Sequence, residues 1–231
     1  MNKTAPPTIV KIAFFGHNVP WAHKIRQNLT NSDKEKYPST PLPKLERSIS
    51  QKLFNLKTLI DETNLEMINI NKELRRRKRE VEENIKRGTV FIPEEPFRII
   101  KILSFTEAVI STIKSICELL HRYSEDFYKI ILGKNKSDLL EDMKGKNINL
   151  EWIDEIADIR NDLLHNYSAW LFFQETDTAY TFGLALPEEM QEKKWAGDSL
   201  TIKQLNKFFR DFEDSYTKLT DLLIEKIQER E

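Results

Sequence analysis

The 231-residue sequence is poor in the residues that build several common kinds of site. Its one cysteine, Cys117, excludes an internal disulfide and fits a reducing compartment, and its apolar neighbours predict an ordinary buried thiol. Six glycines supply no Gly-rich phosphate loop, Walker motif or nucleophile elbow. The four histidines, His17, His23, His121 and His165, lack the close spacing of a zinc or iron site. We therefore expect neither a metal nor a cofactor.

Long apolar runs and a strong charge of one sign are also absent. No apolar stretch approaches the ~20 residues that cross a bilayer, and "TIVKIAFFGH" is too short for a signal peptide and is interrupted by Lys11. The formal net charge of −1 argues against a surface that binds nucleic acid everywhere, although it allows a local basic site. We expect a soluble, cytoplasmic protein that does not associate with membranes.

The prolines divide the chain into a leader and a domain. Those in "APPT", "NVPW" and "YPSTPLP" forbid a long helix, so residues 1–43 predict an irregular leader that packs on the rest. Within it, "TIVKIAFF" is typical of a short strand and "PWAHKIRQNL" of a short helix. With 39% apolar residues, enough for a packed core, residues 44–231 predict one helical domain.

The domain contains four helical patterns. Residues 44–87 hold no proline or glycine and predict one very long helix, or two with a break near Thr63 and Asn64. Gly88 is placed to stop it. Residues 94–132 and 151–170 predict the next two helices, joined by a polar connector with one helical turn. The last helix is expected to start at Ser199 and Leu200, with Ser199 as its N-cap.

An aromatic stretch interrupts the helical pattern near residues 169–186. Two β-prone runs flank the polar "QETDTA", which predicts a small β-hairpin. The fold class expected is therefore all-α: an up-and-down bundle of four to five helices with a hairpin insertion and an irregular leader. Hairpin aromatics such as Trp170, Phe172, Phe173 and Tyr180 either pack on the bundle or stack on exposed bases.

A basic run closes the first long helix pattern. Residues 75–79 are all Arg or Lys, so on a helix they spread around the axis instead of forming a stripe. Glu80, Glu82 and Glu83 follow and offer ion pairs along the helix. Two interpretations stay open: an exposed, ion-paired helix end, and a patch that contacts phosphates.

The helix expected at 151–170 carries a charge on its apolar face. At roughly 100° per residue, Arg160 falls among apolar neighbours such as Ile156, Ile159 and Leu163. A buried guanidinium costs several kcal/mol unless it has a partner. His165 lies about 140° round on the polar side, where Asn161, one turn before it, can contact the imidazole. The pattern leaves two roles open for Arg160: pairing with a core carboxylate, or acting in a functional site.

The stretch "RNDLLH", residues 160–165, resembles the Arg-x4-6-His motif of the HEPN superfamily (higher eukaryotes and prokaryotes nucleotide-binding domains). In that family the residue after the arginine is typically Asn, Asp or His, and Asn161 matches. The family core is a bundle of four or five helices, which agrees with the helical pattern over residues 44–229. The leader and the hairpin depart from the minimal core and indicate a divergent member of bacterial or archaeal type.

The resemblance implies a metal-independent endoribonuclease with a composite active site at a homodimer interface. Arg160 would bind the scissile phosphate, His165 would transfer a proton, and Asn161 would orient either group. Attack by the RNA 2′-hydroxyl would leave a 2′,3′-cyclic phosphate. One helix holds Arg160 and His165 about 140° apart. Two symmetry-related helices can bring the arginine of one and the histidine of the other to the same phosphate.

Three hypotheses follow about function. The first is a ribonuclease that acts as a toxin or defence effector, with RNA as substrate and a minimal nucleotidyltransferase as antitoxin partner. The second is a catalytically inactive HEPN domain that binds a nucleotide, RNA or a protein. The third is a helical interaction module in which the motif is coincidental, and it predicts a monomer with Arg160 paired inside its own bundle.

Overall fold

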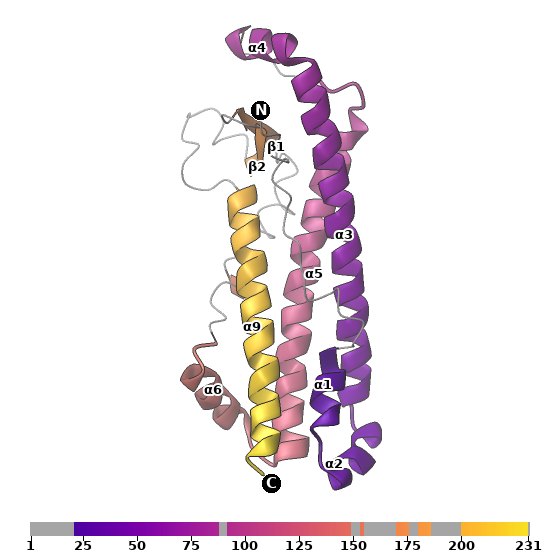
Figure 1. Cartoon of the computed structure of the whole chain (residues 1–231), viewed down its shortest axis with the longest axis vertical. Coiled ribbons are helices and arrows are strands. Elements are labelled where there is room, and N and C mark those ends of the chain that lie inside the picture. Colours follow the sequence, from indigo (N-terminus) through magenta and orange to yellow (C-terminus); the bar gives the residue numbers. More distant parts are fainter. Residues whose placement is uncertain are drawn as a thin grey trace, which may run out of the picture. The chain divides into compact units, whose positions relative to one another are not determined.

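The computed structural model describes residues 21–87, 92–148, 153–154, 170–175, 180–185 and 200–230 (Figure 1). The described part is mostly helical, as the sequence predicts. Its helices are α1 Trp21–Gln27, α2 Asn31–Lys36, the 3₁₀ turn Tyr37–Ser39, α3 Leu42–Arg76, α4 Lys78–Arg87, α5 Phe97–Phe127, the π-helix Tyr128–Leu132, α6 Lys136–Gly145 and α9 Ile202–Gln228. In the described ranges, none of the helices combines the length and apolar character needed to span a bilayer.

Three short strands form an antiparallel sheet in the order β1-β2-β3. They are β1 Trp170–Glu175, β2 Tyr180–Ala185 and β3 Leu200–Thr201. β1 and β2 fall in the range where the sequence predicts a hairpin, and their register pairs Trp170 with Ala185. Gly183 of β2 also pairs with Thr201 of β3.

The leader is not irregular over residues 21–39, which corrects the prediction for this part. α1 lies where the sequence predicts a short helix, and Thr30 caps α2 by accepting a hydrogen bond from the backbone N–H of Asp33. Pro38 occupies the first turn of the 3₁₀ segment and Pro43 that of α3, where a missing N–H costs nothing. The prolines therefore separate short helices instead of preventing them.

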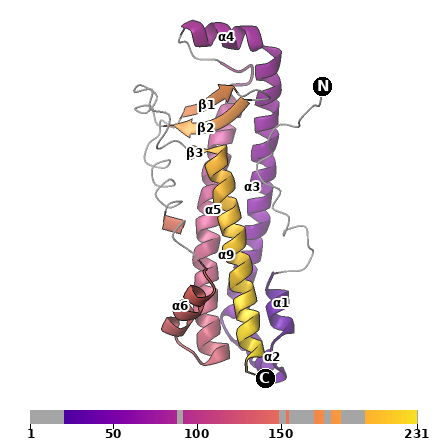
Figure 2. The ribbon, with the colours of Figure 1, turned by 60° about the vertical axis from the view of Figure 1, so that its left-hand side comes forward.

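The first long helix breaks later than expected. A break near Thr63 and Asn64 is wrong, because α3 continues through both residues to Arg76. The Thr63 hydroxyl is buried and donates to the carbonyl of Leu59 at 2.7 Å, so the helix itself satisfies it. The chain breaks at Arg77, and α4 then runs across the direction of α3 (Figures 1 and 2).

Two other boundaries differ from the sequence prediction. α6 spans ten residues instead of one turn, since Asn135 and Asp138 form a reciprocal capping box and Leu139 and Met143 are buried. The last helix begins at Ile202 instead of Ser199, which lies outside the described residues. Leu200 and Thr201 pair with β2, so they belong to the sheet and the helix begins after them.

The chain forms two compact units, and α3, α5 and α9 contribute to both. The described residues of unit 1 are 58–87, 92–110, 170–175, 180–185 and 200–206. Those of unit 2 are 21–57, 111–148, 153–154 and 207–230.

Unit 2 is a helical assembly around a core rich in aromatic residues. Its parts of α3, α5 and α9 run side by side, with α1, α2 and α6 around them (Figures 1 and 2). On α3, the apolar residues recur every three or four positions and are buried, which is why this stretch forms an amphipathic helix. The largest buried side chains of the unit include Tyr123, Phe127, Tyr128, Phe208 and Phe212.

Candidate functional site

The three residues of the predicted active site, Arg160, Asn161 and His165, lie outside the described residues. Of the helix expected at 151–170, the structure describes helical Ile153 and Asp154, and Trp170, which begins β1. The proposed arrangement of Arg160 and His165 therefore stays a prediction. The described residues nevertheless show what surrounds Ile153 and which carboxylates already have cationic partners.

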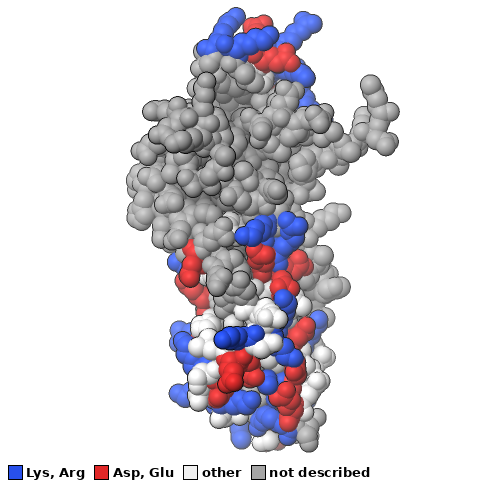
Figure 3. Space-filling view, turned by 90° about the vertical axis from the view of Figure 1, so that its left-hand side faces the viewer, with Lys and Arg blue, Asp and Glu red and all other residues white. Residues whose placement is uncertain are grey.

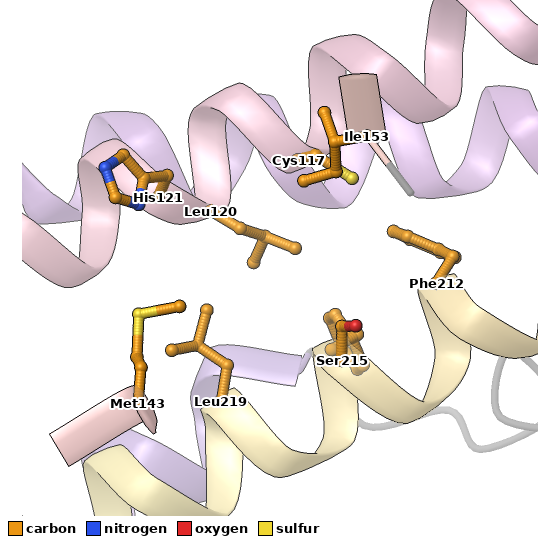
Figure 4. A pocket seen from close by; sticks show the side chains of 9 residues that line it. Cys117, Leu120, His121, Met143, Ile153, Phe212, Ser215 and Leu219 are labelled. Atoms are coloured by element: carbon orange, nitrogen blue, oxygen red, sulfur yellow. The ribbon is translucent and has the colours of Figure 1, made fainter. Parts of the chain in front are cut away.

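A small apolar pocket of unit 2 lies beneath Ile153 (Figure 4). Side chains of α5 and α9 face one another across it, among them Cys117 and Leu120 from α5 and Phe212 and Leu219 from α9. The space open to the centre of a water molecule is about 20 Å³, which suffices for one water. The pocket is thus part of a packed core and has no room for a substrate.

Two groups at this pocket carry potential chemistry, and both have structural roles. Burial raises the pKa of the Cys117 thiol to about 12, so the thiol stays protonated and a poor nucleophile. This confirms the expectation of an ordinary buried thiol. His121 Nε2 lies 2.9 Å from Glu125 Oε1, and Lys136 also pairs with that carboxylate. The Lys136 ammonium and His121 hold the pKa of Glu125 below its usual range.

Arg77 organises the junction between α3 and α4 in unit 1. Its guanidinium donates to Glu73 at 2.9 Å, to Glu80 at 2.8 Å and to the carbonyl of Ile92 at 3.2 Å. The hydrogen bonds with Glu80, and then with Glu73, raise the pKa of Arg77 further. Glu73 also accepts from the backbone N–H of Glu94 at 2.6 Å, which attaches the return segment to the same junction.

The basic run that contains Arg77 is extensively ion-paired in the structure. Arg76 pairs with Glu94 and Lys78 with Glu82, and beyond the run Arg87 pairs with Glu83. This bears out the first interpretation of the run for these cations. Next to the junction, a polar groove runs between α3 and the start of α5. Its lining comprises Asn69, Lys72, Glu73, Arg76, Glu94, Glu95 and Arg98.

Every buried carboxylate of the described residues has a cationic partner. In unit 2, Asp33 pairs with Arg230 at 3.2 Å and Glu46 with Arg26 at 3.1 Å. In unit 1, Glu66 binds Arg98 at 2.8 Å and Lys101 at 3.3 Å, and Glu73 binds Arg77. These ion pairs offset the cost of burying each charge.

A pair of buried tyrosines joins the leader to α5 in unit 2. The hydroxyls of Tyr37 and Tyr123 lie 2.8 Å apart, and Tyr37 also donates to Glu46 at 3.2 Å. The sequence gives no sign of this contact, because 86 residues separate the two tyrosines. Apolar spacing predicts that Tyr123 is buried but not which polar group it meets.

Among the residues whose positions the structure gives, no three His, Cys, Asp or Glu side chains gather in a way that would hold a metal ion. His17 and His165 are not among those residues. Comparisons with protein-family models, with curated proteins and with solved structures found no match.

Proposed function

We propose that this protein is a HEPN-type, metal-independent endoribonuclease whose active site combines residues of two protomers. The observation that carries the proposal is the "RNDLLH" motif at residues 160–165 in a mostly helical chain. The finer fold that the proposal assumes is an up-and-down bundle of four to five helices, one of which continues from Ile153 and Asp154 and holds Arg160, Asn161 and His165.

The proposed chemistry cleaves RNA by internal transfer. The 2′-hydroxyl oxygen attacks the adjacent phosphorus, the bond from phosphorus to the 5′-oxygen breaks, and a 2′,3′-cyclic phosphate remains. Arg160 stabilises the charge that develops on the non-bridging phosphate oxygens. His165 either accepts the proton of the 2′-hydroxyl or donates one to the leaving 5′-oxygen, and Asn161 orients the imidazole or the phosphate.

The ion pairs of the buried carboxylates support a functional role for Arg160. The main alternative pairs this arginine with a core Asp or Glu. In the described residues, however, Asp33, Glu46, Glu66 and Glu73 each have an arginine of their own. These carboxylates therefore do not require Arg160 as a partner, and a guanidinium on an apolar helix face is suited to a phosphate brought by a substrate.

The proposal includes a homodimer and a regulated role in the cytoplasm. Arg160 and His165 lie about 140° apart on the helical wheel, so two symmetry-related helices serve one phosphate better than one helix does. A toxin or defence effector of this kind is held in check by a partner, for which a minimal nucleotidyltransferase is the candidate antitoxin. The second hypothesis, an inactive HEPN domain that binds nucleotide, RNA or protein, requires the same motif but no turnover.

The deciding experiment measures cleavage of labelled RNA by the purified chain in EDTA. We expect cleavage with 2′,3′-cyclic phosphate ends, and a loss of at least about 100-fold for His165→Ala, the range that general acid–base catalysis contributes. Arg160→Ala should lose a similar factor. Lys129→Ala, an exposed change in unit 2, is the control. Equal cleavage by all four proteins, or none by the wild type, would refute the proposal.

A further inference from the structure

The corner between α3 and α4 concentrates positive charge in a chain whose formal net charge is −1. Residues 75–87 hold seven Lys and Arg residues and three Glu residues, an excess of four positive charges. Figure 3 shows Lys and Arg side chains gathered over α4 with acidic residues among them. A local excess of this kind attracts polyanions even when the whole chain is nearly neutral.

The ion pairs divide six of these seven cations into two groups. Arg76, Arg77, Lys78 and Arg87 bind carboxylates, so their charge is largely compensated. Arg79 and Lys86 are exposed on α4 and make no ion pair within the described part of the chain. They are seven positions apart, which places them on the same side of the helix two turns apart, about 10.5 Å along its axis.

The adjoining groove and the start of α5 add a third cation and an aromatic ring. Lys72 lines the groove and is exposed, again with no ion pair from the described side chains. Phe97 directly precedes Arg98, another lining residue, and its ring is 75% exposed. Exposed cations together with an exposed phenyl ring have the composition of surfaces on which single-stranded nucleic acids stack their bases.

We propose that Lys72, Arg79, Lys86 and Phe97 form a docking surface for single-stranded RNA, hereafter the corner surface. The cations bind phosphates of the RNA backbone, and the Phe97 ring stacks on an unpaired base. The choice of RNA rests on the proposed function. The corner surface lies outside the "RNDLLH" motif. Its role is to capture the RNA that the motif would cleave.

The chemistry of α4 favours a nucleic acid over an anionic membrane. A membrane-surface helix exposes an apolar face beside its cations, whereas Val81 of α4 is buried and the neighbours of Arg79 and Lys86 on its exposed side are charged. Glu82 and Glu83 flank the cations and would repel a uniformly anionic sheet. A single strand can place its phosphates on the cations and avoid the carboxylates.

The test measures binding of a labelled oligouridylate of about 16 nucleotides to the full chain carrying His165→Ala, which prevents cleavage. Each phosphate contact contributes about 0.7 to the slope of log affinity against log salt concentration for single strands. Arg79→Gln with Lys86→Gln should therefore make this slope shallower by about 1.4. Lys129→Gln with Lys144→Gln removes the same charge from exposed sites of unit 2 and should leave the slope unchanged.

The aromatic contribution needs its own variant. Phe97→Ala should weaken binding by about fivefold or more, the lower end of the range for loss of one stacked base, without changing the salt slope. Phe54→Ala, at a phenyl ring of unit 2 that is 71% exposed, is the matched control and should leave the affinity unchanged.

The outcomes separate this inference from the proposed function. Equal slopes for the two double variants, or equal affinities for the two phenylalanine variants, overturn the corner surface even if the wild type cleaves RNA. The predicted slope and affinity changes support the corner surface even if the wild type cleaves nothing, in which case only the nuclease proposal fails. Binding to anionic vesicles that exceeds binding to the oligonucleotide also overturns the inference.

Discussion

Buried tyrosine hydroxyls make the stability of unit 2 depend on pH in the alkaline range. Burial raises the pKa of the Tyr123 hydroxyl, and the neighbouring Tyr37 and Glu46 raise it further. Burial also raises the pKa of Tyr37. In the unfolded chain a tyrosine ionises near pH 10. The native state resists this ionisation, so the stabilisation is complete below about pH 10 and is lost as pH rises above it.

Replacing Tyr123 by phenylalanine should change the pH dependence as well as the stability. Above about pH 10, each such tyrosine lowers the free energy of unfolding by about 1.4 kcal/mol per pH unit. Tyr123→Phe should destabilise the protein at pH 8 by about 1–3 kcal/mol, because Tyr37 loses a buried partner. The difference from wild type should then shrink between pH 10 and 11.5. Urea unfolding at several pH values measures it, and a constant difference would contradict the assignment.

For individual residues, the sequence predicts which side chains are buried better than it predicts which polar groups they pair with. Cys117 is the buried thiol that its apolar neighbours predict. The basic run is ion-paired, as the glutamates after it indicate, but two of its most important partners, Glu73 and Glu94, lie on either side of the run at the α3–α4 junction. The pairing depends on where the chain turns, and periodicity carries no information about that.

At the scale of elements, long helices were predictable and their ends were not. Residues 44–87 contain no proline or glycine, so nothing in the pattern marks Arg77 as the break. The second helix was expected to end at Leu132, and it does so by widening into a π-helix that no periodicity indicates. α6 was underestimated because its polar composition conceals a capping box at Asn135.

Gly133 is a position where the end of a helix requires a left-handed backbone conformation. It ends the π-helix with φ +67°, a left-handed value, and a Cβ there would meet no atom within 4 Å. Gly133→Ala should therefore destabilise the protein by about 1–2 kcal/mol through backbone strain alone. Gly145→Ala is the matched control, since its Cβ also meets nothing and its φ is ordinary. We expect it to be neutral or stabilising by up to about 1 kcal/mol in urea unfolding. Equal effects would exclude the strain.

At the scale of the whole molecule, the proposed nuclease is defined by two chains. If Arg160 of one protomer acts with His165 of its partner, Arg160→Ala and His165→Ala homodimers are both inactive. A mixed dimer, however, keeps one complete site. Mixing the two inactive proteins after reversible dissociation should restore about a quarter of wild-type cleavage, because half of the dimers are mixed and each has one of two sites. No recovery in a mixture shown to exchange subunits would refute the composite site.

The candidate site can be predicted from the sequence only through its motif. Arg160 stands out because its charge interrupts an apolar helix face, and its proposed role is what the resemblance of "RNDLLH" to the HEPN motif implies. The corner surface was only partly accessible: the basic run predicts excess charge, but the residues left without carboxylates, Arg79 and Lys86, emerge only once the turn at Arg77 is known.

The sequence spacing of unit 2 sets the order in which the protein can fold during synthesis. Its described parts come from residues 21–57, 111–148, 153–154 and 207–230, and Arg230 reaches back to Asp33 across 197 positions. A nascent chain must therefore keep the apolar faces of the first two parts exposed until α9 leaves the ribosome. At roughly 5–20 residues per second this interval lasts several seconds or more. Such a chain completes its folding late, unlike a helical protein whose contacts are local.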